Sequence, residues 1–441
     1  MALTGARTYV GFGFGAIQAG LFLYEAYRSG NFARLVVAEV MPDLVANLRQ
    51  TDGNYTLNIA HPDRVESVRI GPVEIYDPAV AADRECLIEA LTEAQEAGTA
   101  IPSVTFYRSA GPGSLHRLLA ESLRRKAAGN GPAAVVYAAE NHNHAAEILE
   151  EAVLGELPGQ KQDAARAPVQ YLNTVIGKMS GVASDREAIA RHELVPITPQ
   201  VPRAFLVEAF NRIQISRIGS WGLGTPQFRR GIEVFEEKED LIPFEEAKLY
   251  GHNATHALGA YVGALVGAER MADLAAVPGA LPLLRAAFLK ESGEALVRKH
   301  AGVDPLFSRE GYTQYADDLL ARMTNAYLLD TVERVGRDPA RKLGWDDRLV
   351  GTMRVALGQG VEPPRYAFGA AAALAVLEPS ILEGVTPATA LLGPLWRDAS
   401  PDPVEAEAML SRIEASLHRL RAWGEAGFGD LERIFEGESD V

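Results

Sequence analysis

The chain has 441 residues, of which 47% are hydrophobic and 23% charged, so it has the composition of an ordinary globular protein and enough length for two domains. Its formal net charge of −15 argues against nucleic acid as a partner, because phosphate backbones are bound by clustered Lys and Arg side chains. A single cysteine, Cys86, excludes an internal disulfide and any metal site built from several cysteines.

The N-terminal segment predicts a nucleotide-binding β-α-β unit. Its elements are a strand at 8–10, a helix at 17–26 and a second strand at 35–38. The turn after the first strand fits G-x-G-x-x-G/A through Gly11, Gly13 and Ala16. Glycines make this turn tight and let the backbone approach a pyrophosphate at the helix N-terminus.

An acidic residue, Glu39, ends the second strand. A carboxylate at this position can accept hydrogen bonds from the ribose hydroxyls, and it repels the extra phosphate of NADP. We therefore predict NAD as the cofactor, with a glycine turn of purely structural use as the alternative.

The first predicted strand starts at residue 8, which leaves no room for a cleavable targeting peptide. No apolar run reaches the length of about 18 residues that a membrane span needs. We therefore expect a cytoplasmic protein with no membrane partner.

Alternating helix and strand patterns continue to about residue 180 and predict a parallel sheet with crossover helices. The predicted helices are 87–97, 113–126 and 144–154, the strands are 103–107 and 133–138, and 56–60 and 68–76 are extra strands. Later residues predict mostly helices, at 244–266, 281–298, 311–326, 345–356, 366–377 and 403–420.

Three prolines at 196, 199 and 202 mark the predicted domain boundary. We predict a Rossmann-type dinucleotide-binding domain at 1–195 and a mostly helical substrate and catalytic domain at 196–441. The predicted fold class is therefore α/β, with an N-terminal parallel-sheet domain followed by a mostly α-helical C-terminal domain.

One predicted helix carries a possible base, an amide and an imidazole: Lys248, Asn253 and His256. At about 100° per residue, Asn253 lies roughly 140° around from Lys248 and His256 roughly 80°, so all three fall on one side of the helix. Small residues such as Gly259 and Gly263 follow and permit close approach of other elements. The triplet indicates an active site, and the alternative is the polar face of an ordinary amphipathic helix.

Several further motifs complete a pattern that resembles a known family. They are AEN at 139–141, LNTVIGKM at 172–179 and RMTNAYLLDTVERVGRDPARKL at 322–343. With the glycine turn and the Lys248 helix, they identify the chain as a member of the polyol-specific long-chain dehydrogenase family, the mannitol dehydrogenase family. The segment 322–343 is most similar to the branch that acts on mannitol 1-phosphate.

The resemblance implies a role for each matching residue. Lys248 would be the general base that takes the hydroxyl proton while hydride passes to NAD, without a metal. Asn253 and Asn141 would donate hydrogen bonds to the developing alkoxide, and His256 would hold a neighbouring substrate hydroxyl. Glu245 would relay the proton, or be a solvated helix charge.

Two departures from the family pattern concern the substrate. Gly177 and Lys178 stand where the family has Asp-Arg, and Lys does not replace Arg in a bidentate role. No proline follows Asn325, where the family usually has one. Both put the identity of the polyol in doubt.

A substrate phosphate needs two or three convergent cations, preferably arginines. The candidates are Arg322, Arg334, Arg337 and Arg341. Helical spacing puts the last three near one face unless Pro339 interrupts the helix, and structural ion pairs are the alternative role for each.

We predict no metal site. The donors Glu140, His142 and His144 lack a clear third and fourth protein ligand to complete a coordination shell.

The sequence therefore favours an NAD-dependent dehydrogenase that interconverts a polyol phosphate and a ketose phosphate, with mannitol 1-phosphate and fructose 6-phosphate as the expected pair. An enzyme for an unphosphorylated ketose or a hexuronate is the first alternative. A dinucleotide-binding sensor without catalysis is the second. The expected partner is a small polyol or sugar phosphate, and a monomer and a weak dimer both stay open.

Overall fold

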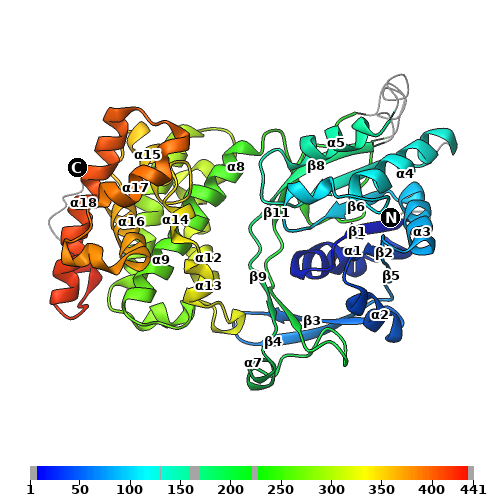
Figure 1. The fold of residues 1–441 in the computed structure, drawn as a ribbon, viewed down its shortest axis with the longest axis horizontal. Helices are drawn as coiled ribbons and strands as arrows, with labels where there is room; N and C mark the ends of the chain where they lie inside the picture. The colour runs from blue at the N-terminus through cyan, green and yellow to red at the C-terminus, as the bar shows by residue number, and fades with distance from the viewer. Residues whose placement is uncertain (1–6, 130, 158–168, 221–226, 436–441) are drawn as a thin grey trace. The chain divides into compact units, whose positions relative to one another are not determined.

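The N-terminal part of the chain builds a mostly parallel sheet. In the computed structural model, which describes residues 7–129, 131–157, 169–220 and 227–435, eight strands lie in the order β12-β11-β8-β7-β6-β1-β2-β5 (Figure 1). Their bounds are β1 Thr8–Phe12, β2 Arg34–Ala38, β5 Glu74–Tyr76, β6 Glu96–Thr99, β7 Ala134–Ala138, β8 Val169–Ile176, β11 Ile213–Ser216 and β12 Phe235–Lys238. Only the pair β8 and β11 is antiparallel in this order. The strand order reverses between β1 and β6, and α/β sheets bind ligands at the carboxyl ends of such a switch point.

Two layers cover this sheet, because side chains on successive strand residues point to opposite faces. One face packs against helices α3 (Ala81–Glu93), α4 (Leu115–Gly129) and α5 (Ala145–Gly155). The other face packs against the first helical segment of the chain, residues 16–29, against helix α2 (Pro42–Gln50) and against a second sheet. That sheet has the order β4-β3-β10-β9, with bounds Val65–Ile70, Tyr55–Ala60, Ala204–Glu208 and Ser180–Ala183. The predicted extra strands at 56–60 and 68–76 are confirmed as β3, the end of β4, and β5.

One predicted strand is wrong. Residues Val104–Tyr107 form the 3-10 helix η2, and the strand lies earlier, at β6, where we predicted the end of a helix. All four residues of β6 are buried, and Gly98 leaves room for the Tyr9 hydroxyl, which lies 2.5 Å from the position a Cβ would take. Glu, Ala and Gly are all depleted in strands, so burial in the centre of the sheet overrides local propensity.

The second half of the described chain is helical, as predicted. Its main helices are α8 Ile242–Glu246, η3 Ala247–Asn253, α9 Ala254–Leu265, α10 Ala280–Ala286, η5 Ala287–Gly293, α11 Glu294–Lys299, α12 Arg309–Met323, α13 Val332–Gly336, α14 Pro339–Lys342, α15 Val350–Gly358, α16 Pro364–Leu377, α17 Ala388–Trp396 and α18 Pro403–Glu425. The predicted helix at 366–377 is confirmed as α16, which is largely buried and packs against both α9 and α18. Gly369 permits this close packing, because a Cβ there would lie 2.8 Å from Leu258.

The chain divides into two compact units, Met1–Ile242 and Pro243–Val441. The boundary that we predicted between residues 195 and 196 falls inside the first unit. The physical reason is strand pairing, because β10 joins β3 and β9, and β11 joins β8. The proline cluster therefore lies in a connection within this unit.

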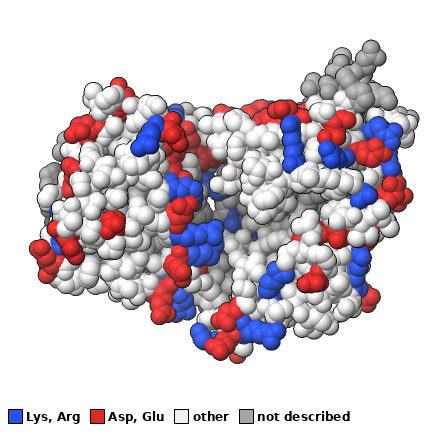
Figure 2. Space-filling view, in the orientation of Figure 1, with Lys and Arg blue, Asp and Glu red and all other residues white. Residues whose placement is uncertain are grey.

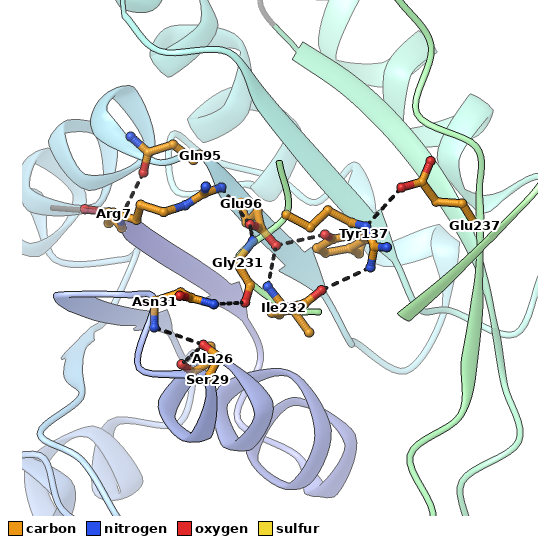
Figure 3. A network of polar contacts seen from close by, with 12 residues as sticks. Arg7, Ala26, Ser29, Asn31, Gln95, Glu96, Tyr137, Gly231, Ile232 and Glu237 are labelled. Atoms are coloured by element: carbon orange, nitrogen blue, oxygen red, sulfur yellow. Dashed lines mark hydrogen bonds and ion pairs between the residues drawn. The ribbon is translucent and has the colours of Figure 1, made fainter. Parts of the chain in front are cut away.

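A buried carboxylate, Glu96, ties the segment before β12 to the main sheet (Figure 3). It is fully buried on β6 and accepts hydrogen bonds from Arg7 Nη2 at 2.9 Å and the Tyr137 hydroxyl at 2.8 Å. It also accepts from the backbone N–H groups of Gly231 and Ile232. A buried charge needs such partners, so this cluster joins segments that are far apart in sequence.

Acidic and basic side chains are interspersed over the face in view in Figure 2. Within the described residues, no helix has the length and apolar character that crossing a membrane requires.

Candidate active site

The glycine turn lies at the carboxyl end of β1 and leads into helical residues 16–29, which include the π-helix η1 (Gln18–Phe22) and α1 (Leu23–Ser29). Gly13 has a φ of +80°, which favours glycine, and a Cβ there would lie 3.0 Å from the Ala100 carbonyl. A Cβ at Gly11 would overlap the Gln18 amide, which donates to the Tyr9 hydroxyl at 2.8 Å. The Gln18 side chain thus packs the space that Gly11 leaves.

The predicted acid, Glu39, is buried beside this turn. Its Oε2 accepts from the backbone N–H of Phe14 at 2.7 Å, and its Oε1 accepts from that of Met41 at 2.9 Å. A carboxylate oxygen has two lone pairs, so both oxygens keep capacity for ribose hydroxyls. A Cβ at Gly15 would meet nothing within 4 Å, so the turn is open on that side. The carboxylate and the open turn, with Ala16 at the start of the helix, fit a dinucleotide.

The carboxyl ends of β7 and β8 hold two asparagines. Asn141 is exposed just beyond β7. Asn173, which we had treated only as part of a motif, is paired in register with Ala138 of β7. Its Oδ1 accepts from the Ala146 N–H at 2.8 Å, and its Nδ2 donates to Glu147 at 2.8 Å. Asn173 therefore holds the start of α5 at the sheet edge where Asn141 lies.

Neighbouring Glu140 is buried and committed to other bonds. It accepts from Thr99 Oγ1 at 2.8 Å, from the Ile101 N–H at 2.9 Å and from the Tyr107 hydroxyl. His142 and His144 are exposed. The residues that the structure describes contain no group of three or more His, Cys, Asp or Glu side chains arranged to hold a metal ion.

In the second unit, the helix that carries the candidate catalytic residues is not a regular α-helix. Residues Ala247–Asn253 form a π-helix, η3, between α8 and α9. A π-helix joins residues i and i+5 by hydrogen bonds, and its insertion in an α-helix often marks a functional site. Lys248 and Asn253 have this spacing, so the wider turn brings them closer around the helix axis than the roughly 140° of an α-helix.

Lys248 has an altered proton affinity. Burial lowers the pKa of Lys248 to about 8, the charge of Glu245 opposes this shift, and the charge of Arg348 adds to it. The ammonium is thus easier to deprotonate than an exposed lysine, as a general base near neutral pH requires.

His256 is one end of a chain of ionisable side chains that continues through Asp330 to Arg334. Asp330 was not among the predicted site residues. His256 Nε2 lies 3.4 Å from Asp330 Oδ2, and Asp330 Oδ1 lies 2.6 Å from Arg334 Nη2. Burial alone would raise the pKa of Asp330, but His256 and Arg334 lower it below its usual value. The carboxylate therefore orients His256. Its position four residues before Arg334 was the available sequence signal.

The other candidate substrate arginines are not gathered on one helix face. Pro339 starts α14, α13 ends at Gly336, and Asp338 between them has a φ of +58°. The helix is therefore interrupted, the possibility that Pro339 raised.

Each of these arginines has its own surroundings. Arg322 is mostly buried and lies 3.1 Å from Asp318, and Arg341 lies 2.9 Å from Asp338. Arg337 is exposed and lines a cavity of about 760 Å³ within the second unit.

Lys178, which replaces the family's arginine, is also buried. Its Nζ donates to the backbone carbonyls of Glu208 at 2.5 Å and Phe210 at 2.7 Å. These bonds hold the connection that follows β10.

A chain of buried hydroxyl groups lies next to the end of the π-helix η3. The Tyr366 hydroxyl lies 2.8 Å from Thr255 Oγ1 and 3.0 Å from Ser292 Oγ, and all three residues are buried. Thr255 is the neighbour of His256, and Ser292 belongs to a second π-helix, η5. The chain therefore links η5 to the start of α9, directly after η3, through Tyr366 of α16.

Replacing Tyr366 with Phe is expected to reduce the free energy of unfolding by about 1–3 kcal/mol, because two buried hydroxyls each lose a partner. Urea unfolding of the full chain measures this change. The matched control is Tyr327→Phe, at an exposed position, which should leave the midpoint unchanged. Equal midpoints for the two variants would show that the hydroxyl chain adds no stability.

The parallel sheet with its glycine turn and acid, followed by a helical unit that carries a buried lysine, is typical of dinucleotide-dependent oxidoreductases. The comparisons with known proteins then give the family. The profile described as the mannitol dehydrogenase Rossmann domain matches residues 7–216, and that of the mannitol dehydrogenase C-terminal domain matches 240–387. The chain belongs to the mannitol dehydrogenase family and is an oxidoreductase of that family.

Curated relatives and solved structures agree with this assignment. Mannitol-1-phosphate 5-dehydrogenase of Bacillus velezensis is 30% identical over 82% of this chain and 86% of its own length, and that of Bacillus licheniformis is 29% identical over the same shares. Pseudomonas fluorescens mannitol 2-dehydrogenase, solved with NAD and D-mannitol, has a TM-score of 0.67, with 17% identity over 98% of this chain and 95% of its own. A D-sorbitol dehydrogenase has a TM-score of 0.74, with 16% identity over 96% and 94%. The two structures share the fold and confirm the predicted fold class.

Proposed function

We propose that the chain is an NAD-dependent dehydrogenase that interconverts mannitol 1-phosphate and fructose 6-phosphate or a close analogue, in the cytoplasm and without a metal. The observation that carries the proposal is Lys248, a lysine with a pKa of about 8 in a π-helical turn with Asn253. A protein that only binds a dinucleotide has no need for such a base. The matches to the two Bacillus mannitol-1-phosphate 5-dehydrogenases support the phosphorylated pair.

Residues of the first unit would hold the cofactor. Gly11, Gly13 and Ala16 would admit the pyrophosphate to the helix N-terminus, and Glu39 would accept hydrogen bonds from the ribose hydroxyls. The charge and position of Glu39 support NAD over NADP, since a 2′-phosphate there would meet a buried carboxylate. When bound, NAD accepts a hydride from the carbinol carbon.

The chain's own residues would move the proton. In the oxidation direction, neutral Lys248 takes the proton of the substrate hydroxyl as the carbon–hydrogen bond breaks. Asn253 and Asn141 donate hydrogen bonds to the oxygen as its negative charge develops. His256, oriented by Asp330, binds a neighbouring hydroxyl. In reduction the same groups act in reverse, and the Lys248 ammonium returns the proton.

The candidate arginines stay as proposed substrate residues, but they differ in burial. Arg322, Arg334 and Arg341 each pair with a carboxylate, but Arg322 is mostly buried in the second unit whereas Arg334 and Arg341 are exposed. Burial removes water that would compete for a substrate phosphate, so Arg322 has the strongest support of the three.

The test is oxidation of NADH and NADPH by the purified protein with fructose 6-phosphate, fructose and fructuronate in parallel. We expect turnover with NADH and a kcat/KM for fructose 6-phosphate that is at least about 100-fold higher than for fructose, a difference that two charge-assisted hydrogen bonds account for. Preference for fructose or fructuronate would replace the phosphate assignment with that of an unphosphorylated ketose or a hexuronate. Binding of NADH with no turnover of any substrate would favour the sensor.

A further inference from the structure

Several positively charged groups converge on His252, a residue that the proposed reaction does not use. His252 is buried, and its ring centroid lies 6.1 Å from that of His256. Burial holds the pKa of His252 well below its usual value, and the nearby charges of Arg322, His256, Lys248 and Arg348 lower it further. His252 is therefore neutral at physiological pH, and basic side chains lie near enough for their charges to act on it.

Packing against the π-helix explains why Arg348 reaches this place. The Thr352 hydroxyl of α15 lies 3.2 Å from the Tyr250 carbonyl of η3 and 2.5 Å from the Arg348 carbonyl. A Cβ at Gly351 would lie 2.7 Å from the Tyr250 ring, so only glycine permits this approach. Arg348 lies three residues before Gly351 in the sequence.

Helix α12 approaches the same π-helix from another direction. A Cβ at Gly251 would lie 2.6 Å from the Tyr312 hydroxyl, so the small residue in η3 admits the tyrosine. Arg322 is in the last turn of this helix. The two arginines thus come from separate segments, each of which also packs on η3, and the charges of both act on His252 in that helix.

Carboxylates also face this group and balance part of its charge. Arg348 Nε lies 2.8 Å from Asp347, Arg322 Nη1 lies 3.1 Å from Asp318, and Asp330 faces His256. A guanidinium carries five N–H donors in a planar fork, so one carboxylate does not exhaust it. The side chain of Arg348 is 15% exposed and that of Arg322 11%, which are low values for cations. Two largely desolvated arginines and a neutral imidazole form a set suited to an anion.

We propose that Arg348 and Arg322, with His252 as a neutral hydrogen-bond donor, bind the phosphate group of the polyol phosphate while its reacting hydroxyl lies at Lys248. The inference rests on the proposed function and names the residues that bind the charged group of its substrate. It replaces the expectation that Arg334, Arg337 and Arg341 form the phosphate site, since those residues lie on interrupted helices and the side chains of Arg334 and Arg341 are 45% and 49% exposed. The carboxylate of a hexuronate shares part of this chemistry, but a phosphate offers more acceptor oxygens to two forked donors.

The first experiment compares Arg348→Gln with wild type at pH 7, where the Lys248 ammonium dominates in both proteins. We expect the ratio of kcat/KM for fructose 6-phosphate to kcat/KM for fructose to fall by about 10- to 100-fold, because charge-assisted hydrogen bonds to the phosphate are lost. Arg354→Gln is the matched control, since Arg354 is on α15 and pairs with Glu405 at 2.8 Å. The control should keep the wild-type ratio. An unchanged ratio in Arg348→Gln would overturn the proposed phosphate site and leave the proposed function standing.

A second measurement does not depend on turnover. Inorganic phosphate should raise the melting temperature of the wild-type protein with NADH bound, and this rise should be lost in Arg348→Gln and kept in Arg354→Gln. An equal rise in all three proteins would contradict the site. If no ketose is turned over, this measurement still tests the anion site, so failure of the proposed function and failure of the inference are distinguishable. If fructuronate raised the melting temperature more than fructose 6-phosphate does, the site would be assigned to a carboxylate instead.

Discussion

Lys248→Met is expected to slow polyol oxidation by about 10²- to 10⁴-fold, the range that a positioned general base contributes. Methionine has a similar length and no proton to exchange, so it removes the base with little change in volume. The loss should appear in kcat, because the lysine acts on a proton that moves in the transition state. Steady-state kinetics in both directions measure it.

The pH dependence gives an independent signature of the same residue. Burial and Arg348 lower the pKa of Lys248 to about 8, against the effect of Glu245. Oxidation needs the neutral amine, so its rate should rise with pH and level off above about 8. Reduction needs the ammonium, so its rate should fall as pH rises through the same value.

Lys299→Ala is the control for these measurements. Lys299 is in the same unit and lies 2.7 Å from Glu246, one residue before η3. It should change neither the rate nor the pH profile. A Lys248→Met enzyme with near wild-type kcat would exclude the lysine as the base, and another group would have to titrate near 8.

Glu96→Ala is expected to lower the free energy of unfolding by about 3–5 kcal/mol, the cost of leaving a buried partner charge uncompensated. Four donors lose their acceptor: Arg7, the Tyr137 hydroxyl and the N–H groups of Gly231 and Ile232 (Figure 3). The side chain of Glu96 is fully buried, so water does not readily replace it.

Urea unfolding of the full chain gives the loss, and hydrogen exchange should place it in β6, β7 and the segment before β12. Glu93→Ala is the matched control on the neighbouring helix α3, where the side chain is 67% exposed and lies 3.3 Å from Arg34. Such exposed pairs contribute about 0–1 kcal/mol. A Glu96→Ala protein as stable as the control would show that the cluster is retained for something other than stability.

The local sequence predicted those parts of the fold that depend on nearby residues. The strand, glycine turn, helix and Glu39 of the first β-α-β unit have the predicted order, because a tight turn needs glycine and a strand needs an alternating or fully apolar run. The main helices of the second unit also follow from their periodicity. The exception was β6, whose residues are mostly poor strand formers and become a strand only between buried neighbours.

The candidate site likewise has features that the local sequence predicted and features that depend on contacts between remote segments. Lys248, Asn253 and His256 could be found on one helix from their spacing alone, but an α-helical spacing does not predict the π-helical turn. That turn depends on Tyr312 packing onto Gly251 and on α15 packing onto Tyr250, contacts that come from distant parts of the chain. The roles assigned to these three residues stay predictions.

The sequence by itself determined the family, the order of the elements and the residue types that the chemistry needs, since these depend on local patterns and motifs. Only the tertiary structure decided which charges meet. It placed Asp330 beside His256 and Arg348 near Lys248, paired Arg334 with Asp330, and extended the first unit to Ile242 through strand pairing. The physical reason is that an ion pair or a lowered pKa depends on burial and distance, and both arise only when remote segments pack together.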